Sequence, residues 1–335
     1  MPVARPECRL RYNHGMPSEF ELIARHFDRP LPASSAVALG IGDDCALLAP
    51  SPGSQLAVSS DMLVEGRHFF PDVDVASLGH KSLAVNLSDL AAMGARPLGF
   101  TLALALPSAD ETWLASFSAG LFELADRHRC PLIGGDTTRG PLNICITIFG
   151  EVPLDDALRR STACPGDDIW VSGALGEARL ALEARTALEL APTAWQQAES
   201  RLLRPVPRVE LGIALRGIAH AAIDLSDGLC GDLGHLLQRS QVGATVDVDA
   251  LPCGAALTTQ SVALRRQCML AGGDDYELCF TAPADTRERV LAAARNAATP
   301  VTRIGTIDAA PGLRLTDSSG RPLDLDYPSF DHFLA

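Results

Sequence analysis

Strand-like and helix-like segments alternate along the chain in two successive series, and this alternation restricts the fold more than any other feature of the sequence. The first series is expected to contain strands at 37–41, 55–61, 98–106, 131–136 and 142–152, and helices at 18–27, 75–94 and 110–128. Segment 98–106 is apolar throughout and is expected to be a fully buried strand. In the first helix, Ser18 and Glu21 have the spacing of a capping box, and Gly94 is expected to end the helix at 75–94.

The second series begins after a change of composition between residues 151 and 167. Its expected strands lie at 168–173, 221–228, 244–249, 277–283, 302–308 and 312–317, and its expected helices at 175–190, 194–203, 207–219, 229–240 and 286–298. Each series predicts a sheet covered by helices, so the fold class is α+β, with two α/β-layered domains. We expect a flexible leader at 1–17, an N-terminal domain at 18–153 and a C-terminal domain at 154–335.

Charge and cysteine usage restrict the partners and the compartment. The 335 residues include 28 basic and 41 acidic side chains, a net charge of −13, which disfavours nucleic-acid and anionic-membrane partners. The apolar run at 100–106 is too short to span a bilayer, and the N-terminus has no apolar signal region. The nine cysteines form no C-x-x-C pair and suit reduced thiols, so a cytoplasmic location is expected.

Aspartates recur where strands or helices end, beside glycine or hydroxyl residues. The segments are GIGDD (40–44), SSDM (59–62), LSDL (87–90), GGDTT (134–138), DLSDG (224–228) and GGDD (272–275). Each of them alone is also an ordinary turn or cap. Six in one chain favour a shared site, because carboxylates at element ends suit Mg²⁺ and bound phosphates.

Asp89 stands out because its helix face is otherwise apolar, with Asn86 nearby. A metal partner would explain a carboxylate there, and a satisfied structural hydrogen bond is the alternative. The glycine turn at 133–138 is able to bring backbone N–H groups close to a phosphate or ribose. A P-loop is excluded because the only lysine, Lys81, follows His80 rather than glycine, and the protein-kinase motifs are absent.

In this order, the motifs GIGDD, SSDMLVEGRHF, GHKSLAVNLSDLAAMGARP, GGDTT, DLSDGL and GGDDYEL resemble the bacterial thiamine-monophosphate kinases. Their superfamily also holds aminoimidazole ribonucleotide synthetase, selenophosphate synthetase and the hydrogenase maturation protein HypE. The resemblance covers about residues 18–333. It implies two domains of the aminoimidazole ribonucleotide synthetase-like fold, with the N-terminal sheets of two subunits paired into a barrel and ATP bound near the interface of a homodimer.

The implied reaction is transfer of a phosphoryl group from ATP directly to thiamine monophosphate, giving thiamine diphosphate. Several Mg²⁺ ions would be held by Asp44, Ser59, Ser60, Asp61, Asp89, Asp136, Asp224 and Asp227. The nucleotide contacts would be Gly135, Asp136, Arg160 and Ser226, and the thiamine phosphate contacts His68, Asp274 and Phe330. No covalent nucleophile is expected, and Asp275 and Glu277 are expected to be structural.

The chain departs from the family pattern at Asp274, where glutamate is usual, and at Ser118, where some members carry an aromatic residue near the adenine. Three of the implied contacts also have a non-functional alternative. Arg160 is then a solvated surface charge, His68 a structural histidine, and Phe330 an aromatic side chain docked into the core. Two other functions stay open. One is another ATP-using synthetase of the superfamily, such as aminoimidazole ribonucleotide synthetase; the other is a non-catalytic nucleotide- or metal-binding protein.

Overall fold

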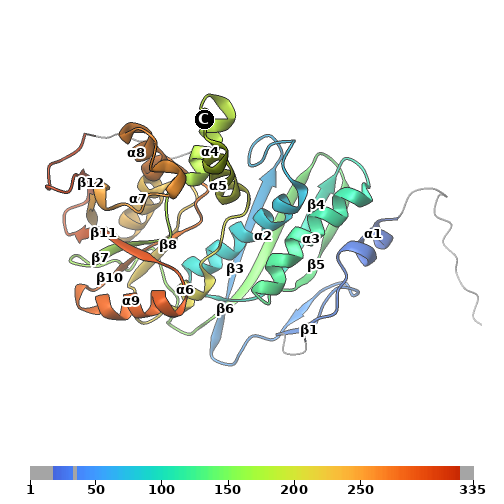
Figure 1. Ribbon diagram of the computed structural model, residues 1–335. Helices are drawn as coiled ribbons and strands as arrows, with labels where there is room; N and C mark the ends of the chain where they lie inside the picture. Colours follow the sequence, from blue (N-terminus) through green and yellow to red (C-terminus); the bar gives the residue numbers. More distant parts are fainter. Residues whose placement is uncertain (1–17, 33–35, 325–335) are drawn as a thin grey trace, which may run out of the picture.

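The computed structural model describes residues 18–32 and 36–324, which form two sheet-and-helix halves (Figure 1). The predicted leader at 1–17 and the expected substrate contact Phe330 lie outside the described residues. The α+β class with two layered halves is confirmed. No helix in the described ranges is both long and apolar enough to cross a membrane.

The N-terminal half is a four-stranded sheet with helices on one face. The strand order is β3-β6-β4-β5, with β4 and β5 parallel and the other pairs antiparallel. The strands are β3 (Ser54–Val64), β4 (Arg96–Leu106), β5 (Leu132–Arg139) and β6 (Asn143–Pro153). Helices α2 (Val75–Ala92) and α3 (Glu111–Arg127) pack against each other and cover the sheet on one side (Figure 1).

The other face of this sheet is largely uncovered. Leu56, Val58 and Met62 alternate along β3 and are 49%, 60% and 54% exposed. The prediction that segment 98–106 is fully buried was wrong for Ala103, which is exposed. Successive side chains of a strand point to opposite faces, and only the face toward α2 and α3 is packed.

The first helix and the end of α2 follow the sequence signals. Helix α1 (Glu19–His26) has the predicted capping box between Ser18 and Glu21, and the Arg25–Glu111 ion pair (2.7 Å) joins α1 to α3. Gly94 follows α2 with φ +63°, a backbone conformation that favours glycine. Strands β1 (Val37–Leu39) and β2 (Leu47–Leu48) form a small separate ladder.

The C-terminal half is a six-stranded sheet of order β12-β9-β11-β7-β10-β8. The strands are β7 (Asp168–Ser172), β8 (Ala221–Asp224), β9 (Gly243–Asp247), β10 (Leu278–Ala282), β11 (Val301–Asp308) and β12 (Gly312–Thr316). The helices are α4 (Glu177–Thr186), α5 (Pro192–Leu203), α6 (Val209–Ala214), α7 (Leu229–Ser240), α8 (Val262–Ala271) and α9 (Arg287–Asn296). Three short 3-10 turns, η1 (Val248–Ala250), η2 (Ala255–Leu257) and η3 (Ala284–Thr286), complete this half.

One hydrophobic core extends across both halves, and a second lies within the C-terminal half. Along β7, Ile169 and Val171 pack with α4, α5, α7 and α8, whereas Trp170 packs toward the N-terminal half. Helix α2 contacts both α6 and β8, so this N-terminal helix lies directly against the C-terminal sheet. The position of α2 relative to β8 decides which functional side chains meet.

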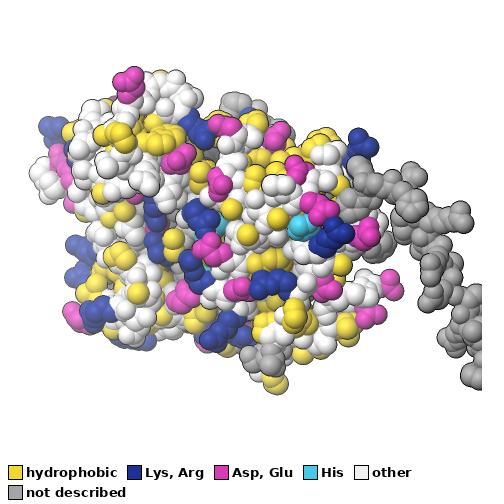
Figure 2. All heavy atoms as spheres, turned by 45° about the vertical axis from the view of Figure 1, so that its right-hand side comes forward, with side chains coloured by type: hydrophobic (Ala, Val, Ile, Leu, Met, Phe, Trp, Pro, Cys, Tyr) yellow, Lys and Arg dark blue, Asp and Glu magenta, His cyan; other side chains and the backbone are white. Residues whose placement is uncertain are grey.

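Several elements differ from the sequence prediction. Strands β3 and β5 each run three residues past the expected end, so Asp61 and Asp136 lie inside a strand rather than at its end. The helix expected over 207–219 is only α6, because the chain turns after Ala214 and Gly217 adopts φ +66°. Helix α8 was not predicted, although Ser261 caps it by accepting a hydrogen bond from the backbone N–H of Leu264 (3.3 Å). On the face in Figure 2, acidic and basic side chains are interspersed rather than gathered in a block of one sign.

Candidate active site

A cleft of about 890 Å³ lies between the two halves. Its walls come from β3, the segment after it, helices α2, α4 and α5, and the loops that follow β8 and α8. The expected site residues among its lining are Ser60, Asp61, His68, Asp89, Asp224, Ser226, Asp227 and Asp274. Carboxylates from both halves of the chain therefore converge on one cavity.

Three of these carboxylates come from three different elements. Asp61 lies on β3, Asp89 lies on the adjoining face of α2, and Asp224 is the last residue of β8. The Ser59 hydroxyl donates a hydrogen bond to an oxygen of Asp89. The Ser88 hydroxyl donates one to Asp224 (2.8 Å). Each serine lies on a different element from the carboxylate that it orients: Ser59 on β3 bonds Asp89 on α2, and Ser88 on α2 bonds Asp224 on β8.

The carboxylates are close enough to disturb each other's ionisation. Burial, together with the neighbouring Asp89, raises the pKa of both Asp61 and Asp224 above the ordinary range of aspartate. Arg160 lies at the limit of ion-pair distance from Asp224, with a guanidinium nitrogen 4.0 Å from a carboxylate oxygen. The cluster therefore carries more negative charge than its described protein contacts neutralise.

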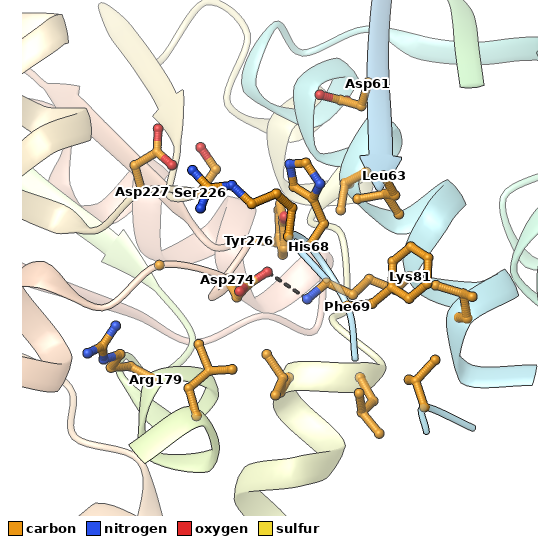
Figure 3. A pocket seen from close by; sticks show the side chains of 18 of the residues that line it. Asp61, Leu63, His68, Phe69, Lys81, Arg179, Ser226, Asp227, Asp274 and Tyr276 are labelled. Atoms are coloured by element: carbon orange, nitrogen blue, oxygen red, sulfur yellow. Dashed lines mark ion pairs between the residues drawn. The ribbon is translucent and has the colours of Figure 1, made fainter. Parts of the chain in front are cut away.

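The turn after β8 is held by another buried aspartate. Asp232 on α7 accepts hydrogen bonds from the backbone N–H groups of Asp227 (3.0 Å) and Gly228 (3.1 Å). Burial raises the pKa of Asp232 to about 7. Gly228 has φ +107°, which favours glycine at this turn. The turn fixes where Ser226 and Asp227 enter the cleft (Figure 3).

The single lysine of the chain lies on the opposite wall. Lys81 on α2 is buried, and its Nζ is 2.6 Å from a carboxylate oxygen of Asp274 (Figure 3). The backbone N–H of Asp274 donates to Ser226 (2.9 Å), which ties the two C-terminal loops together. Asp274 has φ +66°, an uncommon conformation for a residue other than glycine. The Lys81–Asp274 ion pair thus connects the two halves at the cleft.

The next two acidic residues are structural, as the sequence predicted. Glu277 is fully buried and pairs with Arg201 (2.7 Å) and Arg208. Asp275 is also buried and accepts a hydrogen bond from the backbone N–H of Gly176 (2.9 Å). These contacts satisfy both carboxylates away from the cleft.

His68 lines the cleft near Tyr276 (Figure 3). Its Nδ1 accepts a hydrogen bond from the backbone N–H of Val64 (3.0 Å), so the neutral ring carries its proton on Nε2. Such a ring is able to donate to a phosphate oxygen.

Several expected site residues point away from the cleft or lie outside it. Ser60 is among the lining residues, but its hydroxyl is 3.0 Å from that of Thr147, on the sheet face away from Asp89. Asp44 is exposed and outside the cleft lining. Asp136 and Gly135 lie on β5, at the sheet edge opposite β3, where Gly135 has φ +148° and leaves no space for a side chain beside Leu102.

Arg160 lies at the border of the site rather than in it. Together with His235, Gln238, Arg239 and Gln241 it lines a second, smaller hollow. Its ion pair with Asp224 nevertheless connects that hollow to the carboxylate cluster.

Sequence reasoning missed Lys81, Tyr276 and the cleft-lining arginines Arg67 and Arg179. One signal was present: Ser77, Lys81, Val85 and Asp89 recur every four residues, and all four line the cleft. Residues four apart lie on one face of a helix. A polar row of this kind on a buried helix marks the side that faces a cavity.

The cleft residues fit a hard divalent cation. Oxygen ligands from carboxylates are what Mg²⁺ prefers, and Asp61, Asp89 and Asp224 present such oxygens from three elements. Burial and mutual repulsion disfavour the charged forms of Asp61 and Asp224 and raise their pKa values, and a bound cation would offset both effects.

Comparisons with family models divide the chain into two matched regions. Residues 42–152 match the N-terminal domain of AIR synthase related proteins, and residues 164–318 match the C-terminal domain of the same proteins. Together the two regions include all the cleft-lining residues named above.

Curated relatives and solved structures narrow the family. The chain is 48% identical to the thiamine-monophosphate kinase of Escherichia coli O157:H7, over 94% of this chain and 98% of that protein. The thiamine-monophosphate kinase structure from Stenotrophomonas maltophilia K279a has a TM-score of 0.81 and 49% identity, and the match covers 87% of this chain and 93% of that one.

A structure of AaThiL complexed with AMPPCP and TMP matches with a TM-score of 0.73 and 28% identity, over 85% of this chain and 89% of that one. The fold, the cleft and the relatives agree. The chain belongs to the thiamine-monophosphate kinases within the AIR synthase related family.

Proposed function

We propose that this chain transfers the terminal phosphoryl group of ATP directly to thiamine monophosphate, giving thiamine diphosphate and ADP. The observation that carries the proposal is the convergence of Asp61, Asp89 and Asp224 on one cleft between the halves. The relative solved with AMPPCP, a non-hydrolysable ATP analogue, and TMP supports the two substrates.

We propose that Asp44, Ser59, Ser60, Asp61, Asp89, Asp136, Asp224 and Asp227 hold several Mg²⁺ ions. Bound magnesium would neutralise the polyphosphate and lower the cost of bringing two anionic substrates together. Ser59 and Ser88 keep two of these carboxylates in fixed orientations through their hydrogen bonds.

The remaining contacts divide between the two substrates. Gly135, Asp136, Arg160 and Ser226 would contact ATP, and His68, Asp274 and Phe330 would contact thiamine monophosphate. The Nε2–H of His68 suits a phosphate oxygen. The ion pair with Lys81 holds the carboxylate of Asp274 in place, at a position where glutamate is usual.

Direct in-line transfer is proposed because the two hydroxyls held by cleft carboxylates are absent from the lining of the cleft. Ser59 donates to Asp89 and Ser88 donates to Asp224, and neither serine lines the cavity. An attack by the substrate phosphate on ATP needs positioning and charge neutralisation, and both are available without a covalent intermediate.

We also propose a homodimer that works in the cytoplasm. The uncovered face of β3, with Leu56, Val58 and Met62, is an apolar surface that a second copy would cover. Asp44 and Asp136 lie outside the cleft of a single chain. A second copy at the N-terminal sheet would bring further groups close to them.

The decisive experiment is mass-spectrometric detection of thiamine diphosphate when the purified protein meets ATP, Mg²⁺ and thiamine monophosphate. Product in amounts that exceed the enzyme concentration is expected. ATP binding without product would favour the non-catalytic alternative. Turnover of ATP with aminoimidazole ribonucleotide precursors alone would favour another synthetase of the superfamily.

A further inference from the structure

A second group of potential metal ligands lies at the opposite end of the C-terminal sheet. Cys164 and Asp167 belong to the turn before β7, and His220 directly precedes β8. Strands β7 and β8 are both antiparallel to β10 and therefore run in the same direction, so their starting ends lie at the same sheet edge. Asp224 is at the other end of β8, so this group is separate from the cleft.

The three side chains meet closely enough to bind one ion. One ligand atom each from Cys164, Asp167 and His220 lies within 4.8 Å of the other two. A tetrahedral zinc site with bonds of about 2.0–2.3 Å has ligand atoms roughly 3.3–3.8 Å apart. The existing separations therefore need only small side-chain movements, and no change of the backbone.

The backbone that carries the ligands is held in place independently of any metal. Asp167 is buried, and its carboxylate accepts hydrogen bonds from the backbone N–H of Cys164 (2.9 Å) and the hydroxyl of Thr281 (3.2 Å). The Thr162 hydroxyl donates to the carbonyl of His220 (2.6 Å). A frame that is already ordered lowers the entropic cost of collecting three ligands around an ion.

Metal binding would replace the existing contact between His220 and Asp167. The Nδ1 of His220 lies 3.0 Å from both carboxylate oxygens of Asp167, which places a proton between the two groups. A divalent ion bound at Nδ1 would displace that proton, and the neutral ring would then carry its proton on Nε2. The Cys164 thiol would release its proton to solvent as it becomes a thiolate. Cys164 and His220 are exposed, so the ion has a path of entry and water is able to fill a fourth position.

We propose that Cys164, Asp167 and His220 form a site for a borderline-soft divalent metal, of which Zn²⁺ is the typical member. A mixed sulfur, nitrogen and oxygen ligand set selects Zn²⁺ or Co²⁺ over Mg²⁺, which prefers oxygen alone. The metal chemistry of this site is therefore distinct from that of the carboxylate cleft. Its role is to clamp the turn before β7 to the start of β8.

Titration of the full-length, untagged protein with Co²⁺ in the presence of excess Mg²⁺ tests the proposal. The Mg²⁺ occupies oxygen sites, and a thiolate-to-cobalt charge-transfer band reports cysteine ligation. We expect the band to saturate at one equivalent of Co²⁺ and to disappear when Zn²⁺ is added. Absence of the band in the wild-type protein would overturn the proposal, whatever the variants do.

Two pairs of variants make the assignment specific. Cys164→Ser should abolish the band, whereas Cys45→Ser, at another exposed cysteine, should keep it. His220→Asn should weaken Co²⁺ binding about 10-fold or more, whereas His235→Asn, at another exposed histidine, should not. A band that survives Cys164→Ser and is lost in Cys45→Ser would refute the site. Zn²⁺ should also raise the melting temperature of the wild-type protein and not that of Cys164→Ser, whose exposed side chain makes unfolding by the substitution itself unexpected.

Discussion

Asp89 illustrates how a single residue acquires its environment from two sources. Its place on α2 follows from the sequence, while its neighbours Asp61 and Asp224 come from β3 and β8. The alternative role for Asp89, a structural carboxylate satisfied by a hydrogen bond, is supported in part, because the Ser59 hydroxyl donates to it. One hydroxyl does not neutralise a carboxylate that lies among others, so the metal interpretation retains its physical basis.

Asp89→Asn should lower the rate of thiamine diphosphate formation about 100-fold or more, because a charged ligand of the cleft is replaced by a neutral group. Folding should change little, since the substitution removes one of several mutually repelling charges. Steady-state kinetics and a melting curve measure the two effects. Asp285→Asn, on an exposed turn, is the control, and near-normal turnover of Asp89→Asn would remove it from the metal set.

The ion pairs of Asp168, which lie away from the cleft, predict how the stability of the protein depends on pH. Asp168 is buried and pairs with Arg287 (2.5 Å) and Arg303 (3.3 Å), and the hydrogen bonds from Arg287 hold its pKa below the ordinary value. A lowered pKa in the folded state adds stability that is fully present above the unfolded value, near pH 4. That stability is lost as the pH falls through the folded value.

Arg287→Leu should therefore cost about 1–3 kcal/mol of unfolding free energy at pH 7, and Arg303 limits the loss by keeping one partner for Asp168. The difference from the wild-type protein should begin to shrink below about pH 4, where Asp168 of the unfolded chain is protonated, and should vanish below the lowered pKa of the folded wild-type protein. Urea denaturation across this pH range measures it. Arg295→Leu, at an exposed position of α9, is the control, and a difference that stays constant with pH would contradict the assignment.

Among the elements, α2 is the one that organises the molecule. It packs on α3, carries Lys81 and Asp89, and contacts β8 and α6 of the other half. Its approach to α3 is close because both helices have glycine at the crossing. A β-carbon at Gly79 would lie 2.0 Å from the carbonyl oxygen of Phe117, and one at Gly120 would lie 1.7 Å from that of Ala76.

Gly120→Ala should destabilise the fold by about 1–3 kcal/mol or more, because the helices must move apart or distort. Gly234→Ala is the matched change in α7, where a β-carbon would meet nothing within 4 Å. That substitution should stabilise the protein by about 0.5–1 kcal/mol through improved helix propensity. Chemical denaturation measures the change in unfolding free energy of each variant, which should be a loss for Gly120→Ala and a gain for Gly234→Ala. Equal changes in the two variants would contradict the close crossing of α2 and α3.

Prediction of helix ends from the sequence succeeded where all the residues of a capping signal lie close together in the chain. The capping box of α1 and the glycine after α2 are satisfied within a few residues, so tertiary context was not needed. It failed over 207–219, where the apolar spacing continues but the chain turns after α6. Prediction of burial failed for Ala103, because which face of a sheet is covered depends on where the helices pack.

At the scale of the whole molecule, the main prediction is that a second copy of the chain covers the open face of the N-terminal sheet. Val58→Glu places a charge on the apolar surface that includes Leu56 and Met62, and burying that charge against a second copy is unfavourable. The variant should be monomeric under conditions in which the wild-type protein is dimeric. Light scattering coupled to size-exclusion chromatography measures the mass.

The control for this experiment is Val262→Glu, at a valine that is 52% exposed and begins α8. A glutamate in the first turn of a helix is favourable, so this variant should retain the wild-type mass. A monomeric wild-type protein, or a dimer that survives Val58→Glu, would contradict the proposed pairing.

The sequence by itself determined the two series of strands and helices and placed Asp224 at the end of its strand, whereas Asp61 and Asp136 lie inside strands that run past their expected ends. Periodicity, caps and turns act over a few residues, which is why these features are readable from the chain. Only the tertiary structure decided that Asp61, Asp89 and Asp224 share a cleft while Asp44 and Asp136 lie outside it, and that Lys81 pairs with Asp274. Electrostatic interaction depends on distance, and those distances are set by how α2 packs against the C-terminal half.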